Sequence, residues 1–290
     1  MSSLVLNRRN QSARKTVVNL FFYLLLTLVG LIFLLPFLWM LSSSLKTVAE
    51  IFKYPPEWIP RIRRWSNYTD IFSAMPFGRY FFNSVKVSVL STIGVVFSSA
   101  LAAFAFARLK FPGRNIIFAL LLSTMMLPNE VTLIPLFFVM RTLGVINTHI
   151  PLYLADFFGN PFGTFLLRQF FLTVPKELED AAKIDGASAF TIFRQIFLPL
   201  SKPALTTLAV LTFMWRWEEL LRPVVYLSDR EKMTLTVGLT AYYQEGFYGQ
   251  LMRWDLLMAS NILSLVPILL LFILGQKYFV EGITMSGLKG

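Results

Sequence analysis

The chain has 290 residues, of which 56% are hydrophobic and only 15% are charged, and its mean hydropathy is positive. Soluble domains carry about 25% charged residues, so this composition excludes an ordinary soluble protein and indicates one that lies mostly in a lipid bilayer. The formal net charge of +11 is then typical of cytoplasmic loops and anionic lipid contacts rather than of nucleic-acid binding. There is no cysteine for disulfide or thiolate chemistry, and the single histidine, His149, cannot form a metal site alone.

Six stretches are long enough to cross a membrane, which takes about 20 apolar residues in a helix. We therefore expect an all-α, polytopic membrane protein with six transmembrane helices. Their approximate ranges are 17–41, 81–107, 116–140, 150–171, 204–227 and 256–279. Polar or helix-breaking residues interrupt three of them. The first follows a basic segment, as a signal peptide does, but its apolar run is too long and lacks a small-residue cleavage site, so we interpret it as a retained anchor.

The distribution of basic residues predicts the orientation of these spans. Basic residues cluster before the first span, between the second and third, and between the fourth and fifth: Arg8, Arg9, Arg14, Lys15; Arg108, Lys110, Arg114; Lys176, Lys183, Arg194 and Lys202. Because short cytoplasmic segments are enriched in Lys and Arg, we expect these segments, together with the tails 1–16 and 281–290, on the cytoplasmic side. The first outer loop, residues 46–79, also holds six basic residues, which weakens the argument.

The connection between the fourth and fifth spans, residues 172–203, is longer than a turn requires. It contains the polar run Glu-Leu-Glu-Asp-Ala-Ala-Lys-Ile-Asp-Gly-Ala-Ser at residues 177–188. Pro175 suits a helix start and Gly186 a helix break, so we expect two short helices. From the residues alone, an amphipathic hairpin that lies on the membrane surface remains an equal alternative.

The same connection resembles the cytoplasmic coupling loop of ABC importer permeases. The match is a Glu-Ala-Ala-type pattern with a following glycine and an Ile-x-Leu-Pro ending, at Ala181, Ala182, Gly186, Ile196, Leu198 and Pro199. Flanking segments along nearly the whole chain resemble the maltose-permease class, which imports carbohydrates. The resemblance implies a type I importer permease fold, with residues 17–280 as the permease domain. It also implies ATPase-coupling roles for Glu179, Asp180, Ala181, Ala182, Asp185, Gly186, Ile196, Leu198 and Pro199.

The chain departs from the family pattern in two places: in the coupling loop, and in the fifth span, where Glu218 replaces an asparagine and Arg216 adds a cation. The family usually has a glutamate where this chain has Asp180, so a contact to the ATPase there keeps its charge but is one methylene shorter.

The resemblance further implies what surrounds the chain. We expect a second, homologous permease subunit, an ATPase dimer that binds ATP and Mg, and an extracytoplasmic sugar-binding protein, working by alternating access in a bacterial or archaeal cytoplasmic (inner) membrane. The chain itself would be no enzyme, with no catalytic residue, cofactor or metal. It lacks a Gly-x-x-x-x-Gly-Lys loop, as a permease without its own nucleotide site should.

Two other classes of function are less favoured. A self-contained secondary transporter should contain internal repeats, and none is evident. An intramembrane protease needs a nucleophile and a base, and no Gly-x-Ser-x-Gly motif is present. A permease for a non-sugar solute stays open.

The fifth span carries an unusual charged run at residues 215–219. An ionisable group at mid-membrane is costly and is usually paired, pore-facing or functional. Arg216 lies near the centre of the span, and Glu219 is three residues on, within pairing distance on a helix. One interpretation is an ion pair buried against the second permease subunit; the other places these residues on the substrate path, where tryptophans stack on sugar rings. The path candidates are Glu130, Trp215, Arg216, Trp217, Glu218 and Glu219.

The substrate is the least determined feature. Aromatic residues make up 16% of the chain, but most are phenylalanine, which packs or faces lipid more often than it binds ligands. A set of basic residues predicted to lie outside suggests an anionic saccharide, or an acidic surface on the binding protein. This set is Arg61, Arg63, Arg64, Arg79 and Arg222.

Overall fold

The computed structural model describes residues 2–249 and 252–287, and within them it contains helices but no β-strand. Three helical segments are long and apolar enough to cross a membrane: Val18–Ser43, Phe77–Arg108 and Trp254–Lys277. Two further candidates are bent pairs, Arg114–Met126 with Asn129–Thr142 at 104° and Ala189–Leu200 with Lys202–Trp217 at 76°. The all-α prediction is confirmed, with three to five candidate spans; the count of six stays a prediction.

The segment expected as the fourth span is not one continuous helix. It consists of α7 (Ile150–Tyr153), the 3-10 helix η2 (Leu154–Phe158) and α8 (Pro161–Thr173). Gly159 has φ +130, a backbone conformation that breaks the helix. Asn160 then caps α8, because its Oδ1 accepts a hydrogen bond from the Gly163 N–H at 2.7 Å.

The third and fifth expected spans also consist of separate helices. In the third, α5 (Arg114–Ser123) and the 3-10 helix η1 (Thr124–Met126) stop before Pro128, and α6 (Asn129–Thr142) begins after it. Proline favours an extended residue before it, and Leu127 has φ −80, ψ 125. In the fifth, α12 (Lys202–Trp217) and α13 (Leu221–Tyr226) are separate helices.

The remaining elements complete the order along the chain. They are α1 (Ser2–Ser43), α2 (Val48–Ile51), α3 (Asn67–Ala74), α4 (Phe77–Arg108), α9 (Lys176–Ile184), α10 (Ala189–Ile192), the π-helical η3 (Phe193–Phe197), α11 (Leu198–Leu200), the 3-10 helix η4 (Arg230–Lys232), α14 (Leu235–Gly249) and α15 (Trp254–Gly287). Helix α1 continues through the segment expected as an N-terminal tail. The predicted C-terminal tail falls partly in α15, and residues 288–290 lie outside the described residues.

By its internal contacts the chain divides into two compact units. The first contains residues 1–71 and 252–263, and a buried asparagine organises it: the Asn67 side-chain amide donates to the carbonyls of Ser44 and Lys46, at 2.9 and 3.0 Å. The Lys46 ammonium lies 4.2 Å from the ring centre of Trp39. Burial lowers the pKa of Lys46.

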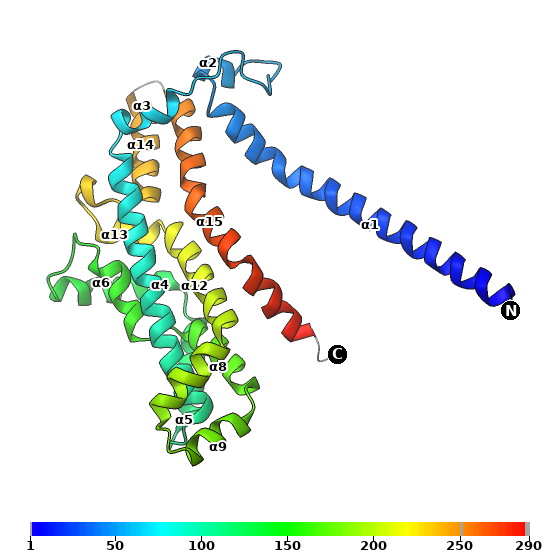
Figure 1. The fold of residues 1–290 in the computed structure, drawn as a ribbon. Coiled ribbons are helices and arrows are strands. Elements are labelled where there is room, and N and C mark those ends of the chain that lie inside the picture. The colour runs from blue at the N-terminus through cyan, green and yellow to red at the C-terminus, as the bar shows by residue number, and fades with distance from the viewer. Residues whose placement is uncertain (1, 250–251, 288–290) are drawn as a thin grey trace. The chain divides into compact units, whose positions relative to one another are not determined.

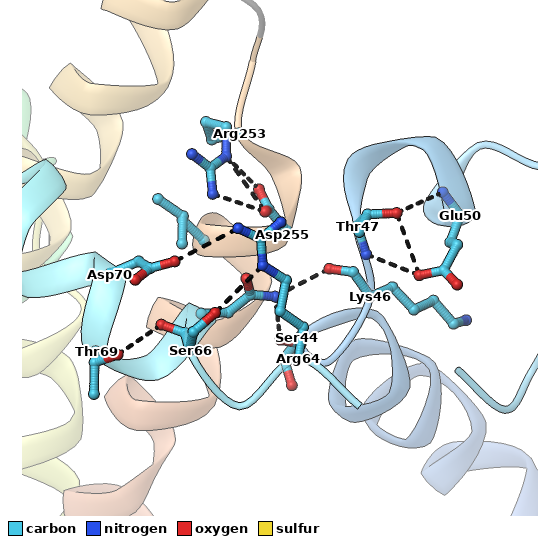
Figure 2. Close-up of polar contacts among 12 residues, drawn as sticks. Ser44, Lys46, Thr47, Glu50, Arg64, Ser66, Thr69, Asp70, Arg253 and Asp255 are labelled. Carbon is cyan, nitrogen blue, oxygen red and sulfur yellow. Dashed lines mark hydrogen bonds and ion pairs between the residues drawn. The ribbon is translucent and has the colours of Figure 1, made fainter. Parts of the chain in front are cut away.

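Polar pairs surround this centre (Figure 2). Thr47 and Glu50 form a reciprocal capping box at the start of α2. Arg64 lies 3.8 Å from Asp70, and Arg253 and Asp255 are paired at 2.9 Å at the start of α15. Polar contacts therefore help to fold the loop after α1, together with the ring contacts of Trp39 with Trp58 and of Phe52 with Trp254.

The second unit is built on α4, which packs lengthwise against α8 and α12 (Figure 1). Its largest apolar cluster joins these helices to the α10–η3 segment, through Val95, Ala100, Ala103, Phe104, Leu167, Phe171, Val174, Ile192, Phe193, Phe197 and Leu208. Helices α4 and α8 lie in close contact at Gly163, where a Cβ atom would lie 2.4 Å from the Ser99 Oγ. Small residues that allow such close approach are typical of membrane helix pairs.

We expect Gly163→Ala to destabilise the protein by about 1–3 kcal/mol, because the added methyl overpacks the α4–α8 contact. The measurement is the midpoint of thermal unfolding in detergent. Gly30→Ala in α1 is the matched control, because a Cβ there meets nothing within 4 Å and alanine favours a helix by about 1 kcal/mol over glycine. An equal or higher midpoint for Gly163→Ala would contradict the close packing.

Candidate functional site

The loop expected to couple to an ATPase forms a helical hairpin at the end of the second unit where α4 ends and α5 begins (Figure 1). Its first helix, α9, starts directly after Pro175 and ends at Ile184. Gly186 follows with φ +80. The N–H of Ala187 donates to the Ala182 carbonyl at 2.9 Å and the N–H of Gly186 to the Lys183 carbonyl at 3.0 Å. This is the Schellman pattern, which requires a left-handed residue after the helix.

The second half of the hairpin starts with a side-chain cap. The Ser188 Oγ accepts a hydrogen bond from the Thr191 N–H at 3.2 Å, which satisfies one of the free donors at the start of α10. The chain then passes through the π-helical η3, in which Phe193 and Phe197 are buried. Two short helical stretches on either side of Gly186 were predicted, and the structure confirms them.

One arginine attaches the hairpin to the rest of the unit. The Arg108 side chain is 4% exposed and lies 3.6 Å from the Glu179 carboxylate of α9. Its Nη2 donates to the carbonyl of Phe171, at 2.6 Å, and to that of Val174, and its guanidinium lies 4.9 Å from the centre of the Phe197 ring. Arg108 thus joins α4, the end of α8, α9 and η3.

The α9 carboxylates differ in their surroundings. Glu179 is largely buried and binds both Arg108 and Lys183, the latter at 2.7 Å. Asp180 is exposed and lies 3.7 Å from Lys183. The hydrogen bond to Glu179, followed by the charges of Glu179 and Asp180, raises the pKa of Lys183 against a smaller opposing effect of desolvation. Lys183 therefore stays charged, and Asp180 keeps a free face.

The expected coupling residues are thus not equally accessible. Asp180, Ala181, Asp185, Gly186 and Pro199 are exposed, whereas Glu179, Ala182, Ile196 and Leu198 are partly buried. The sequence reasoning missed two features: Arg108 as the anchor, and Ile184, which is 87% exposed at the tip of α9. A large apolar side chain at such a tip is the available signal, because exposed apolar groups among charged ones mark contact surfaces.

The charged run of the fifth span forms a chain of four side chains. Arg216 binds Asp156 of η2 at 2.6 Å and lies 3.3 Å from Glu219, and the Arg222 Nη2 donates to Glu219 at 2.7 Å. Cations and anions alternate, so the chain of charges is neutral. Asp156 Oδ2 and Arg216 Nε are buried without a hydrogen-bond partner among the described residues. The predicted Arg216–Glu219 pair exists, but the sequence reasoning missed Asp156, which lies 60 residues away.

The other path candidates lie in different environments. Trp215 is 53% exposed and makes an edge contact with Phe162; Glu218 and Glu130 are exposed. Trp217 is 4% exposed, and its Nε1–H donates to the Ser264 carbonyl at 3.1 Å. The Trp217 ring is therefore engaged inside the unit. In the part of the chain that the structure describes, no group of three His, Asp or Glu side chains is placed to hold a metal ion.

Comparisons with known proteins show the family to which the chain belongs. A family described as "Binding-protein-dependent transport system inner membrane component" matches residues 94–285. The arabinooligosaccharides transport system permease protein AraQ of Bacillus subtilis is 33% identical over 96% of this chain and 97% of its own length. The diacetylchitobiose uptake system permease protein NgcG of Streptomyces coelicolor is 34% identical over 90% of this chain and 86% of its own.

Among solved structures, a bacterial ABC transporter involved in the import of the acidic polysaccharide alginate has a similar fold. The TM-score is 0.77 with 24% sequence identity, and the match covers 91% of this chain and 96% of the other.

We expect Arg108→Ala to destabilise the protein by about 3 kcal/mol, because it removes the donor to two carbonyls and one of the two cations that pair with a largely buried carboxylate. Glu179→Gln should cost about 1 kcal/mol or less, since Arg108 keeps both carbonyls. Thermal unfolding of the two variants in detergent checks this order. A larger loss for Glu179→Gln would show that Arg108 is not the main anchor.

Proposed function

Because the chain belongs to the family of inner membrane components of binding-protein-dependent transport systems, we propose that it is a permease subunit of an ATP-driven importer for oligosaccharides, acidic ones included. A permease of this family is not itself an enzyme. In the proposal it forms the pore with a second, homologous permease subunit, while two ATPase subunits bind ATP and Mg. An extracytoplasmic binding protein delivers the sugar, and transport proceeds by alternating access.

The hairpin is the single observation that supports the coupling role best. Its second half is packed into the core, whereas its first half, α9, presents Ala181, Asp185 and the apolar tip Ile184 to solvent. A small residue lets a partner backbone approach closely, and an exposed apolar tip suits insertion into a groove. We assign α9 and Gly186 to the contact with an ATPase subunit, with Arg108 passing its motion to α4.

The proposed orientation puts this hairpin and both chain termini in the cytoplasm, with six passages through a bacterial inner membrane. The basic residues at the end of α4 and in the hairpin support it through the positive-inside rule. The broken third, fourth and fifth segments each count as one passage in this arrangement. Broken helices occur in membranes where protein or a wet cavity satisfies the freed backbone groups.

We expect Gly186→Val to reduce uptake by about five- to thirtyfold while membrane insertion is unchanged. A left-handed backbone costs an L-residue roughly 1–2 kcal/mol. A free-energy cost of that size lowers the ratio of native to non-native turn about five- to thirtyfold. Gly186→Asn is the matched control, because asparagine tolerates this conformation and a Cβ here meets nothing within 4 Å. The measurement is sugar uptake and ATP hydrolysis by the assembled importer in proteoliposomes.

The Gly186→Asn control also distinguishes the effect of backbone strain from that of a side chain that obstructs a partner. Wild-type uptake by both variants would remove the hairpin from the coupling mechanism. Equal loss in both would replace the backbone explanation by a steric one, with a partner filling the space next to Gly186.

For the substrate path we retain Trp215, Glu218 and Glu130, whose side chains are exposed. Arg216 is paired with both Asp156 and Glu219, so in this proposal Arg216 and Glu219 hold the broken fifth segment in position beside the path. Trp217 is left out because its indole is engaged inside the unit.

The preference for acidic sugars draws support from the alginate transporter rather than from the outer basic residues. Four of these have carboxylate partners: Arg61 with Glu57, Arg64 with Asp70, Arg79 with Glu231 and Arg222 with Glu219. Hydrogen bonds from Arg61 and Lys53 lower the pKa of Glu57 to about 2, so that carboxylate stays ionised. Only the Arg63 side chain lacks an ion-pair partner among the described residues.

We expect uronate-bearing oligosaccharides to be taken up with a lower half-saturating concentration than neutral ones of equal length. Trp215→Ala should raise that concentration about two- to tenfold, the equivalent of one aromatic contact of roughly 0.5–1.5 kcal/mol, and Trp215→Phe should restore most of it. Uptake by the reconstituted importer is the assay. A preference for neutral sugars would contradict the proposal of an acidic substrate. An unchanged half-saturating concentration in Trp215→Ala would show that this ring does not contact the sugar.

A further inference from the structure

A cleft of about 890 Å³ lies between the end of α4, the turn from α4 to α5, and helix α9. Five basic side chains line it, against two acidic ones. The charged residues are Arg108, Lys110, Arg114, Lys176, Lys183, Glu179 and Asp180. The cleft therefore carries a clear excess of positive charge, and the proposed substrate path does not use it.

The excess positive charge of the cleft comes from three of its five basic side chains, which have no carboxylate partner among the described residues. Arg108 and Lys183 are paired with the α9 carboxylates. Arg114 donates from Nη1 to the Leu109 carbonyl at 3.1 Å, which leaves its charge uncompensated. Lys110 and Lys176 form no ion pair within the described residues. Three unpaired cations around one cleft attract an anion.

The walls of the cleft show which kind of anion fits. Ile116 at the start of α5 and Leu172 near the end of α8 line the same cleft, and both are exposed; Phe111 adds a half-buried ring. An inorganic or other fully polar anion gains nothing from apolar walls. A phosphate headgroup attached to acyl chains uses both kinds of surface, since the cations hold the phosphate and the apolar residues contact the chains.

The position of the cleft along the helices also favours a lipid headgroup. Helix α4 is a candidate membrane span that ends at Arg108, and the first bent pair begins at Arg114. The cleft therefore lies where two apolar segments end, at the level of lipid headgroups. Basic pockets at such places bind anionic lipid headgroups.

We propose that this cleft binds the phosphate headgroup of an anionic phospholipid through Lys110, Arg114 and Lys176. The four α9 residues that line it, Lys176, Glu179, Asp180 and Lys183, are spaced i, i+3, i+4 and i+7 and so form one face of the helix. A bound headgroup would bridge the α4–α5 turn to that face. This inference needs membrane insertion but not the proposed substrate, because its readout is lipid binding.

The test compares phosphatidylglycerol with phosphatidylcholine binding by native mass spectrometry of the full-length protein in detergent. We expect the wild type to bind phosphatidylglycerol at least about tenfold more tightly. The variant K110Q/R114Q/K176Q should lose this preference, because each basic residue near an anionic headgroup contributes roughly fivefold. Lys110 and Lys176 are exposed and Arg114 is partly exposed, and an unchanged unfolding midpoint without lipid verifies the fold.

The matched control is R79Q/R230Q/K232Q, which removes three cations from a hollow of about 500 Å³ elsewhere in the unit. There Arg79 is paired with Glu231 and Lys232 with Asp229, so we expect the lipid preference to survive. A similar loss of the phosphatidylglycerol preference in both variants would show that it depends only on net charge, and would overturn the proposed site.

Two further arms distinguish the sources of the phosphate. Inorganic phosphate and glycerol phosphate are added as competitors, and we expect neither to displace the lipid at equal concentration. Displacement by either would overturn the lipid assignment in favour of a soluble anion. If K110Q/R114Q/K176Q keeps its lipid preference but no longer retains an ATPase subunit in a co-expressed complex, the cleft is a protein contact and the proposal is wrong.

Discussion

The hairpin depends on the multiple contacts of one guanidinium. The last four carbonyls of a helix have no partner within the helix and carry partial negative charge. Arg108 donates to two carbonyls at the end of α8, those of Phe171 and Val174, and it still reaches Glu179 with Nη1. Only a planar group with several donors makes these contacts together, so lysine is no equivalent. Arg108 thus caps the end of α8 and holds the start of the hairpin, α9, next to it.

The same physical requirement explains how the broken segments hold together. A helix break in a membrane frees backbone groups that must find partners within the protein. Hydroxyls on α4 provide them: Ser91 donates to the Leu152 carbonyl at 3.2 Å and Ser98 to the Asp156 carbonyl at 2.9 Å. The Asp156 side chain in turn neutralises Arg216. Helix α4 is therefore both the packing centre of its unit and the hydrogen-bond donor for its irregular neighbour.

Composition and span length predicted the helical, membrane-embedded character of the chain, because both depend on the number of apolar residues. The hairpin was also predictable, since Pro175 and Gly186 act locally through their own backbone restrictions. Two features were not predictable in this way. The first was the exact position of the helix breaks, at Gly159 and before Pro128. Polar and helix-breaking residues indicated that three spans are interrupted, but a window of apolar residues does not locate a single backbone break.

Long-range pairing was the second gap. Arg108 with α8 and α9, and Asp156 with Arg216, join residues about 60 positions or more apart. No periodicity in the sequence records which charged side chains meet across that distance. The pairing of Arg216 with Glu219 was within reach of the sequence because it depends only on helical spacing.

The charged and apolar faces of α9 allow both proposed partners to bind at once. The residues that line the basic cleft occupy one face, i, i+3, i+4 and i+7 from Lys176. Leu178 and Ala181 lie on the opposite side of the helix, and neither they nor Ile184 line the cleft. A lipid headgroup would therefore hold α9 from the membrane side without covering the tip that an ATPase subunit would grip. Because the two partners would use different faces of α9, we expect lipid and the ATPase subunit to bind independently. An ATPase subunit that contacted Lys110 or Lys176 would instead compete with the lipid.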